Sequence, residues 1–284
     1  MKWLKISSLV LFLSLVLAPK TFAYPDVDRP IILVYLSGIG CHNCAQTDPV
    51  IFFEWTQKFP NILIFDYEIF KHELDNFILK REYFKTYSPD GKSGVPFIIL
   101  NNKISAMGRV SVLEFESTLK FATPNSFPMS NGATTEFKDL DLNKLEGKFN
   151  IWSKNRVLIP GHNASNEDLK TILLAGNIED ALKNIKNKKV DPISVDISGG
   201  EAQFTHAVMV GDWRVQWNDM EGQAVSKIKV LTPTPNVTKP STNSKVIVKT
   251  NIPKHKSNGN IRIIEYVLAV LLIISALLFI KKKR

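Results

Sequence analysis

The sequence predicts a mixed α/β domain, followed by a small α+β domain, a stalk and one C-terminal transmembrane helix. Residues 30–122 alternate short apolar runs with helical patterns, which is typical of strands joined by helical crossovers. The only two cysteines of the 284-residue chain, Cys41 and Cys44, lie where the first predicted strand gives way to a helix. Both ends of the chain carry apolar runs beside lysines, which indicates targeting to a membrane.

The predicted elements of residues 30–122 follow the order strand, helix, strand, helix, strand, strand, helix. The first strand is a near-continuous apolar run, as expected of a strand buried on both faces. Strand–helix–strand units predict parallel pairing, whereas the Asn101-Asn102 turn predicts an antiparallel hairpin, so we expect a mixed sheet flanked by helices. The predicted strands are 31–36, 61–68, 96–100 and 103–107, and the predicted helices are 45–58, 70–87 and 112–121.

The middle helix, residues 70–87, is strongly charged and carries four apolar residues spaced to share one face. These residues are Phe70, Leu74, Phe77 and Ile78. We expect them to form the buried side of an amphipathic helix that covers the sheet. An alternative is that this helix borders a substrate groove.

This order of elements, with Cys-x-x-Cys at the first strand-to-helix junction, resembles the thioredoxin fold. Pro49 falls five residues after Cys44, where thioredoxins carry the proline that kinks their active-site helix. Gly94-Val95-Pro96 is similar to the thioredoxin element whose cis proline faces the cysteines, and Gly108 fits the glycine after the last strand. The resemblance covers residues 28–122. It implies that Pro96 is cis and that the backbone of Val95 pairs with an incoming peptide strand.

The chain differs from thioredoxin proper near the cysteines. Thioredoxins carry a buried Asp six residues before the first cysteine, and here that position is Tyr35. The two residues between the cysteines are His42 and Asn43, without proline, and the middle helix is longer. These differences favour the secreted disulfide oxidase and isomerase branches, which carry a His between their cysteines, although at the second position.

Residues 123–136 are rich in Pro, Ser, Asn, Gly and Thr, which predicts a linker. Residues 137–231 then predict a second, small α+β domain of unknown role. Its alternating Trp213, Val215 and Trp217 predict one buried strand face, and an exposed docking or sugar-binding patch is the alternative. The predicted strands are 148–152, 156–160, 190–197 and 204–210, and the predicted helices are 167–175 and 178–187.

The two ends of the chain predict its location. Residues 1–23 have the basic start, apolar centre and small terminal residue of a cleaved signal peptide. Residues 232–262 form a basic stalk rich in Pro, Thr and Lys, and residues 263–280 are long enough for one transmembrane helix. The basic tail 281–284 favours a cytoplasmic C-terminus. We therefore expect a single-pass protein of the cell membrane, with its bulk outside the cytoplasm.

The formal net charge of +9 belongs mainly to these ends. Residues 24–231 retain 23 of the 36 basic residues and 26 of the 27 acidic residues, a net charge of −3. Without a basic excess, the globular part gives no electrostatic case for binding nucleic acid.

The cysteine pair predicts thiol–disulfide exchange. Cys41 lies at the start of a helix, where unpaired N–H groups and the helix dipole favour a thiolate, so we expect it to be the attacking residue. Cys44 is expected to be the buried resolving thiol. His42, when protonated, would stabilise the thiolate. Asn43 also lies between the cysteines, and we expect it to modulate the pair or to position a substrate. No bound cofactor or metal is needed, because the dithiol itself carries two electrons.

We expect the partners to be protein thiols and disulfides, together with a membrane redox protein that resets the single pair. A structural disulfide and half of a metal site are the alternatives in which the cysteines exchange no disulfides. A different class of protein also competes, namely a non-catalytic chaperone or adaptor whose cysteine pair only regulates client binding. Whether the protein oxidises, isomerises or reduces its clients depends on the reduction potential of the pair.

Overall fold

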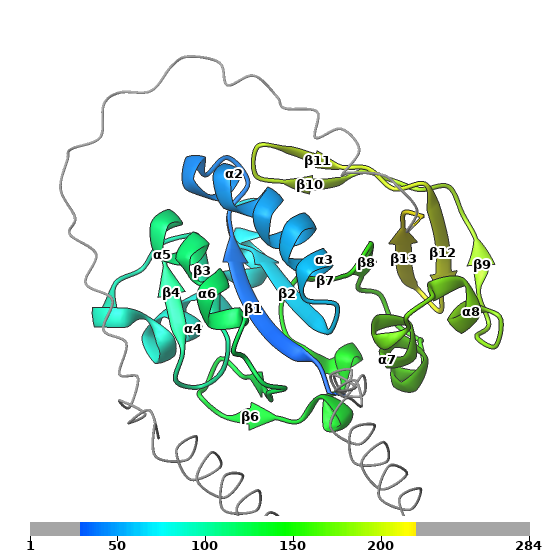
Figure 1. Cartoon of the computed structure of the whole chain (residues 1–284), viewed down its shortest axis with the longest axis horizontal. Helices are drawn as coiled ribbons and strands as arrows, with labels where there is room; N and C mark the ends of the chain where they lie inside the picture. The colour runs from blue at the N-terminus through cyan, green and yellow to red at the C-terminus, as the bar shows by residue number, and fades with distance from the viewer. Residues whose placement is uncertain (1–28, 220–284) are drawn as a thin grey trace, which may run out of the picture. The chain divides into compact units, whose positions relative to one another are not determined.

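The computed structural model describes residues 29–219, and these contain a nine-stranded mixed sheet covered by helices (Figure 1). The strands of this sheet are β1 (Ile31–Ser37), β2 (Ile62–Glu68), β3 (Phe97–Ile99), β4 (Ser105–Met107), β7 (Asn150–Ser153), β8 (Arg156–Ile159), β9 (Lys188–Lys189), β12 (His206–Val210) and β13 (Trp213–Trp217). Their order across the sheet is β4-β3-β1-β2-β7-β8-β13-β12-β9. Two short hairpins lie outside this sheet, β5 (Phe127–Pro128) with β6 (Thr134–Thr135), and β10 (Val195–Ile197) with β11 (Gly200–Ala202).

The helices lie on both faces of the sheet. One face is covered by a helical segment made of α2 (His42–Pro49), a π-helical turn (Val50–Trp55) and α3 (Thr56–Lys58), together with α5 (Arg109–Glu114) and α6 (Glu116–Leu119). The other face is covered by α4 (Glu73–Tyr87), α7 (Asn166–Leu174) and α8 (Ile178–Leu182). Figure 1 shows the α2–α3 segment running along β1 and β2. Three short 3-10 turns complete the elements, Pro89–Gly91, Phe137–Asp139 and Leu142–Lys144.

Strand β1 is central to the sheet. It pairs in parallel with β2 and antiparallel with β3, and β3 and β4 form the predicted antiparallel hairpin. Alternate residues of β1 enter two different cores, with Leu33 and Tyr35 on one face and Val34 and Leu36 on the other. The prediction of a strand buried on both faces is therefore confirmed.

The buried face of α4 is not the predicted one. Phe70, Leu74, Phe77 and Ile78 are exposed, and the Leu74 side chain retains 96% of its accessible surface. The face that packs on the sheet contains a mixture of apolar and hydrogen-bonding residues, namely Asn76, Leu79, Tyr83 and Tyr87.

Hydrogen bonds explain why the mixed face is buried. The Asn76 amide donates to the carbonyl of Glu68 at 2.8 Å and accepts from the backbone N–H of Lys148 at 2.7 Å. The hydroxyls of Tyr83 and Tyr87 donate to backbone carbonyls of residues 128 and 129 at 3.0 and 2.7 Å. A pattern of apolar residues cannot reveal a buried face whose polar atoms find partners on other segments.

The segment predicted as a linker packs against the sheet. Asn125 holds the start of β1, since its side chain accepts from the N–H of Ile32 at 2.7 Å and donates to the carbonyl of the same residue at 3.0 Å. Phe127 of β5 is buried against Phe65 of β2, with ring centroids 4.8 Å apart. The Pro- and Ser-rich composition of residues 123–136 therefore indicates irregular backbone, and this segment is part of the core.

The two predicted domains share one sheet. β7 pairs antiparallel with β2, from Ile64 opposite Trp152 to Asp66 opposite Asn150, so the sheet continues without a break into the second region. This pairing satisfies backbone groups that β2 would otherwise expose as an edge strand. The second region thus extends the first sheet, in contrast to the separate α+β domain that the sequence suggests. Its Trp213 and Trp217 are buried, as predicted.

Among residues 29–219, no helix has both the length and the apolar character that a membrane span requires. The predicted signal peptide (1–23), stalk (232–262), transmembrane helix (263–280) and basic tail (281–284) lie outside the described residues.

We expect substitutions on the two faces of α4 to differ in their effect on stability. Leu79→Ala should lower the free energy of unfolding by ~2–4 kcal/mol, because it leaves a cavity in the core. Leu74→Ala should change it by less than ~0.5 kcal/mol, because this side chain contacts mainly solvent. Chemical denaturation of the two variants measures both values. Equal losses would show that α4 packs through the other face.

Candidate active site

The two cysteines lie at the junction of β1 and α2. After β1 ends, the chain turns through Gly40, whose φ of +89° falls in the region that favours glycine. Cys41 is the N-cap of α2, and its sulfur accepts the backbone N–H of Cys44 at 3.2 Å. The first turn of the helix thus presents its N–H groups to the Cys41 sulfur, as the sequence predicts.

A buried carboxylate at the end of β2 fixes the turn before the cysteines. Glu68 accepts backbone N–H groups from Ile39 at 2.8 Å, Phe70 at 2.8 Å and His72 at 2.9 Å. Its oxygens therefore tie the β1–α2 turn to the segment that leads into α4. The Phe70 ring lies against Gly38, where a side chain would come within 2.8 Å of the ring.

The two sulfurs have opposite character. They are 2.8 Å apart, and the Cys44 thiol donates to Cys41. This hydrogen bond, with further ones from the backbone N–H groups of Cys44 and Asn43, lowers the pKa of Cys41 to about 6. The same contact and burial raise the pKa of Cys44, which is fully enclosed. Cys41 is therefore suited to act as a nucleophile and Cys44 as a thiol held in reserve.

Val95 and Pro96 lie opposite Cys41. The Cys41 sulfur is 3.7 Å from the Val95 carbonyl oxygen, to which it donates. The Val95–Pro96 peptide bond is cis, as the resemblance to thioredoxins implies. The carbonyl of Pro96 accepts the N–H of Gly108 at 2.8 Å, which anchors this segment beside β4. The structure thus brings Val95 and Pro96 to the cysteine pair.

His42 and Asn43 occupy the exposed first turn of α2. The His42 ring lies against the Gln46 side chain, with Nε2 of each residue 2.8 Å apart. The charge of His42 contributes to the lowered pKa of Cys41, although less than the hydrogen bonds do. Both residues face solvent beside the pair.

Beneath the pair lies a buried hydrogen-bonded network that the sequence does not predict. The Tyr35 hydroxyl donates to Asp48 Oδ1 at 2.5 Å and lies 3.0 Å from the Thr47 hydroxyl. The backbone N–H of Ser198 donates to Asp48 Oδ2 at 2.8 Å, and the Ser198 hydroxyl donates to the carbonyl of Gly38. Burial raises the pKa of Asp48 to about 7.

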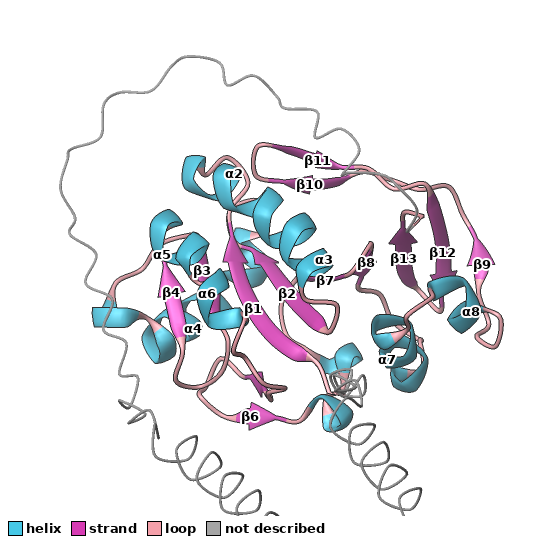
Figure 2. Ribbon diagram, viewed as in Figure 1, coloured by secondary structure: helices cyan, strands magenta, loops and turns pink. Residues whose placement is uncertain are grey.

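Ser198 belongs to the β10–β11 hairpin, which reaches from the second region to α2 (Figure 2). The apolar residues Val195, Ile197 and Ala202 pack into the same core as β1 and the α2–α3 segment. Gly199 at the tip has a φ of +88°, and a side chain there would lie 2.9 Å from Ala45. The hairpin thus closes over the helix that carries both cysteines.

The sequence carries a signal for Asp48 but none for Ser198. Asp48 follows Cys44 by four residues, so a helix places the two on one face, and the sequence contains that information. The contact of Ser198 with Asp48 joins residues 150 positions apart, and only the tertiary structure reveals it.

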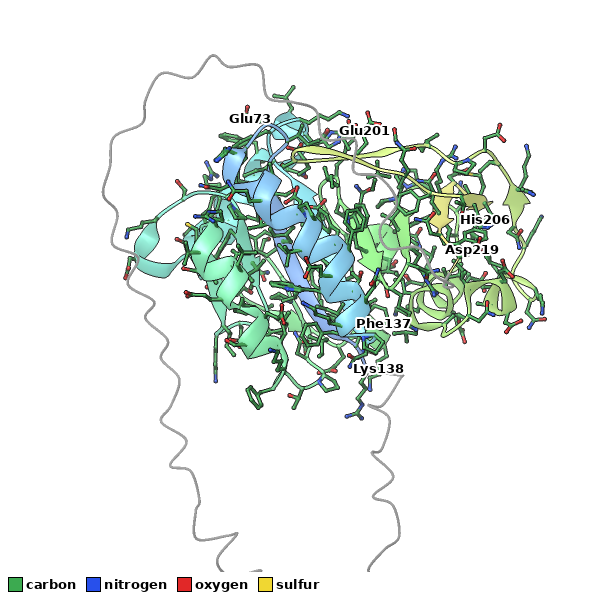
Figure 3. The ribbon with its side chains drawn as sticks, turned by 45° about the horizontal axis from the view of Figure 1, so that its top comes forward. Glu73, Phe137, Lys138, Glu201, His206 and Asp219 are labelled. Atoms are coloured by element: carbon green, nitrogen blue, oxygen red, sulfur yellow. The ribbon has the colours of Figure 1, made fainter. Side chains whose placement is uncertain are left out.

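Among residues 29–219, a single cluster has three side chains suited to hold a metal ion, and it lies away from the cysteines. Glu179, His206 and Asp219 each place one ligand atom within 4.8 Å of the others. Figure 3 shows His206 beside Asp219, and a 3.0 Å hydrogen bond joins the two. This bond and the stacking of the His206 ring on Trp217 account for its position.

We expect alkylation of the reduced protein to report the Cys41 thiolate. The rate with iodoacetamide should rise as pH increases through about 6, because the thiolate is the reactive form. Cys44→Ala should move this inflection to higher pH, since it removes the thiol donor that lowers the Cys41 pKa most. The Cys41→Ser variant, which keeps only the buried thiol, is the control. An inflection near the ordinary cysteine value of ~8.5 in the native protein would contradict the assignment.

No family model matches this chain, and neither the curated proteins nor the solved structures that were searched contain a match.

Proposed function

We propose that this protein is a thiol–disulfide oxidoreductase of thioredoxin-like type, which exchanges disulfides with protein substrates through Cys41 and Cys44. The main support is the paired environment of the sulfurs, one half-buried with a lowered pKa and the other enclosed with a raised pKa. A structural disulfide would need neither the difference in burial nor the difference in pKa between its two sulfurs. The β4-β3-β1-β2 strand order and the cis proline opposite Cys41 agree with the resemblance to thioredoxins.

The exchange proceeds in two steps. In the reducing direction, the Cys41 thiolate attacks a substrate disulfide, a Cys41–substrate bond forms and one substrate thiolate leaves. Cys44 then attacks the Cys41 sulfur, a Cys41–Cys44 disulfide forms and the second substrate thiolate leaves. The dithiol loses two electrons and the substrate disulfide gains them. In the oxidising direction the same steps run in reverse, starting from a substrate thiolate and the Cys41–Cys44 disulfide.

We further propose that the reaction takes place outside the cytoplasm, at the membrane surface. Support comes from the sequence, in which residues 1–23 resemble a signal peptide and residues 263–280 a membrane anchor. A second, membrane-bound redox protein would restore the pair after each turnover. The exposed apolar residues Leu74, Phe77 and Ile78 of α4 also suit contact with unfolded chains, and favour client binding as the second candidate function.

Trapping separates exchange from client binding without exchange. Cys44→Ser should accumulate mixed disulfides with substrate proteins, because Cys41 still attacks and no thiol resolves the product. Non-reducing gel electrophoresis detects these adducts. The double variant Cys41→Ser/Cys44→Ser is the control and should form none. If Cys44→Ser forms no more adducts than this control, the protein is a binder and the oxidoreductase proposal fails.

His42→Ala should lower the reduction potential of the pair by ~10–30 mV, because it removes a charge that stabilises the reduced, thiolate form. Equilibration with glutathione measures the potential. Gln46→Ala is the matched control, since it removes the neighbour of His42 and keeps its charge. An unchanged potential would exclude this role for His42. A native value near that of thioredoxin, about −270 mV, would favour reduction of clients, and one ~100 mV higher would favour oxidation.

A further inference from the structure

Asp48 and Cys44 lie one helical turn apart on α2, and both are buried. Cys44 has no exposed surface and Asp48 retains 1%. Residues four apart on a helix are surface neighbours, with about 5–6 Å between their Cβ atoms, so the carboxylate lies on the same side of the helix as the thiol. The charge of Asp48 also acts on Cys44, since it contributes to the raised pKa of that thiol. A buried acid and a buried thiol thus lie one turn apart on the same side of α2.

We propose that Asp48 is the proton acceptor for Cys44 when this thiol attacks the Cys41–substrate disulfide, and that the β10–β11 hairpin holds it in place through Ser198. The inference rests on the exchange reaction proposed above and names the group that accepts the proton of the Cys44 thiol. When the reaction runs in reverse, protonated Asp48 returns the proton to Cys44 as the Cys41–Cys44 bond breaks.

The need for an acceptor follows from burial. A thiol must lose its proton to become a nucleophile, and the enclosed position of Cys44 opposes the charged form. Transfer of the proton to an ionised Asp48 leaves the total charge of the buried site unchanged. The site then holds one negative charge before and after the transfer, so no second charge has to be buried.

The step balances within the chain. The Cys44 proton passes to Asp48, and the Cys44 sulfur forms a bond with the Cys41 sulfur. The bond between Cys41 and the substrate breaks, and its electron pair leaves with the substrate sulfur. Asp48 then releases the proton to solvent. The proton moves directly or through one water molecule, the range over which a general base acts.

Groups from two other elements hold the carboxylate. Tyr35 on β1 and Ser198 on the hairpin donate to its two oxygens, at 2.5 and 2.8 Å. These hydrogen bonds lower the pKa of Asp48 and partly offset the effect of burial, so that the value of about 7 lies near neutrality. A general base works best when its pKa lies near the operating pH.

The titratable groups that face Asp48 are few. Cys41 and Cys44 lie on its own helix, Tyr35 on β1 and Asp66 on β2. Asp66 is also buried, where it accepts the Ser37 hydroxyl at 2.6 Å, and burial raises its pKa well above the usual range. Asp66 is therefore a buried acid of the same kind without a hydrogen bond to the network beneath the cysteines, which makes it a matched control.

Two-phase kinetics with an aromatic disulfide, 5,5′-dithiobis(2-nitrobenzoate), test the proposal on the full chain. Attack by Cys41 releases the first coloured thiolate, and resolution by Cys44 releases the second. In the native protein the rate of the second phase should rise as pH increases through about 7, because the ionised carboxylate accepts the proton. Asp48→Asn should slow the second phase by ~100-fold, the lower end of general acid–base catalysis, and remove this inflection.

The first phase serves as the folding control and should change by less than ~3-fold in Asp48→Asn, within the usual effect of an indirect substitution. Asp66→Asn should leave the second phase unaltered. Tyr35→Phe removes a hydrogen bond that lowers the Asp48 pKa, so this variant should move the inflection to higher pH. This variant tests the proposal even if Asp48→Asn does not fold.

A second phase of native rate and pH dependence in Asp48→Asn, or an inflection that stays in place in Tyr35→Phe, would overturn the inference. Its failure is distinguishable from that of the proposed function. If Cys44→Ser traps substrates while Asp48→Asn resolves them at the native rate, exchange is retained and only the proton acceptor is wrong. If Cys44→Ser traps nothing, the exchange reaction itself fails.

Discussion

The burial of β1 on both faces is the constraint on which the rest of the structure depends. A strand in this position must present apolar residues at every place, and it must have hydrogen-bonded neighbours on both edges. β2 and β3 supply those edges, in parallel and antiparallel directions. Because β1 is fixed from all four sides, the turn that follows it holds Cys41 at a defined place at the start of α2.

Polar groups placed inside this core require partners, and they connect distant parts of the chain. Glu68 ties the cysteine turn to the start of α4 through three backbone N–H groups. Asp48 and Ser198 tie α2 to the second region. A buried polar group without a partner typically costs about 1–3 kcal/mol. These contacts therefore favour a single placement of the β10–β11 hairpin on α2. The second region therefore supplies part of the site as well as strands of the sheet.

Two negative charges do not coexist easily beneath the pair. The Cys41 thiolate is half-buried, and Cys44 and Asp48 are enclosed. The charge of Cys41 raises the pKa of both Cys44 and Asp48, and the charge of Asp48 raises the pKa of Cys44. This coupling adds to the opposite character that the hydrogen bond between the sulfurs creates, since a charge on Cys41 favours a protonated Cys44. It also links the chemistry at the sulfurs to the protonation of a carboxylate that no substrate reaches.

The sequence by itself determined β1, the antiparallel β3–β4 hairpin and the position of Cys41 at a helix start, because each depends on neighbouring residues. The tertiary structure decided the buried face of α4, the continuation of the sheet from β2 into β7, and the contact between Asp48 and Ser198. These features depend on hydrogen bonds between segments far apart in the chain. Apolar periodicity records which residues avoid water, but not which polar atoms find partners inside.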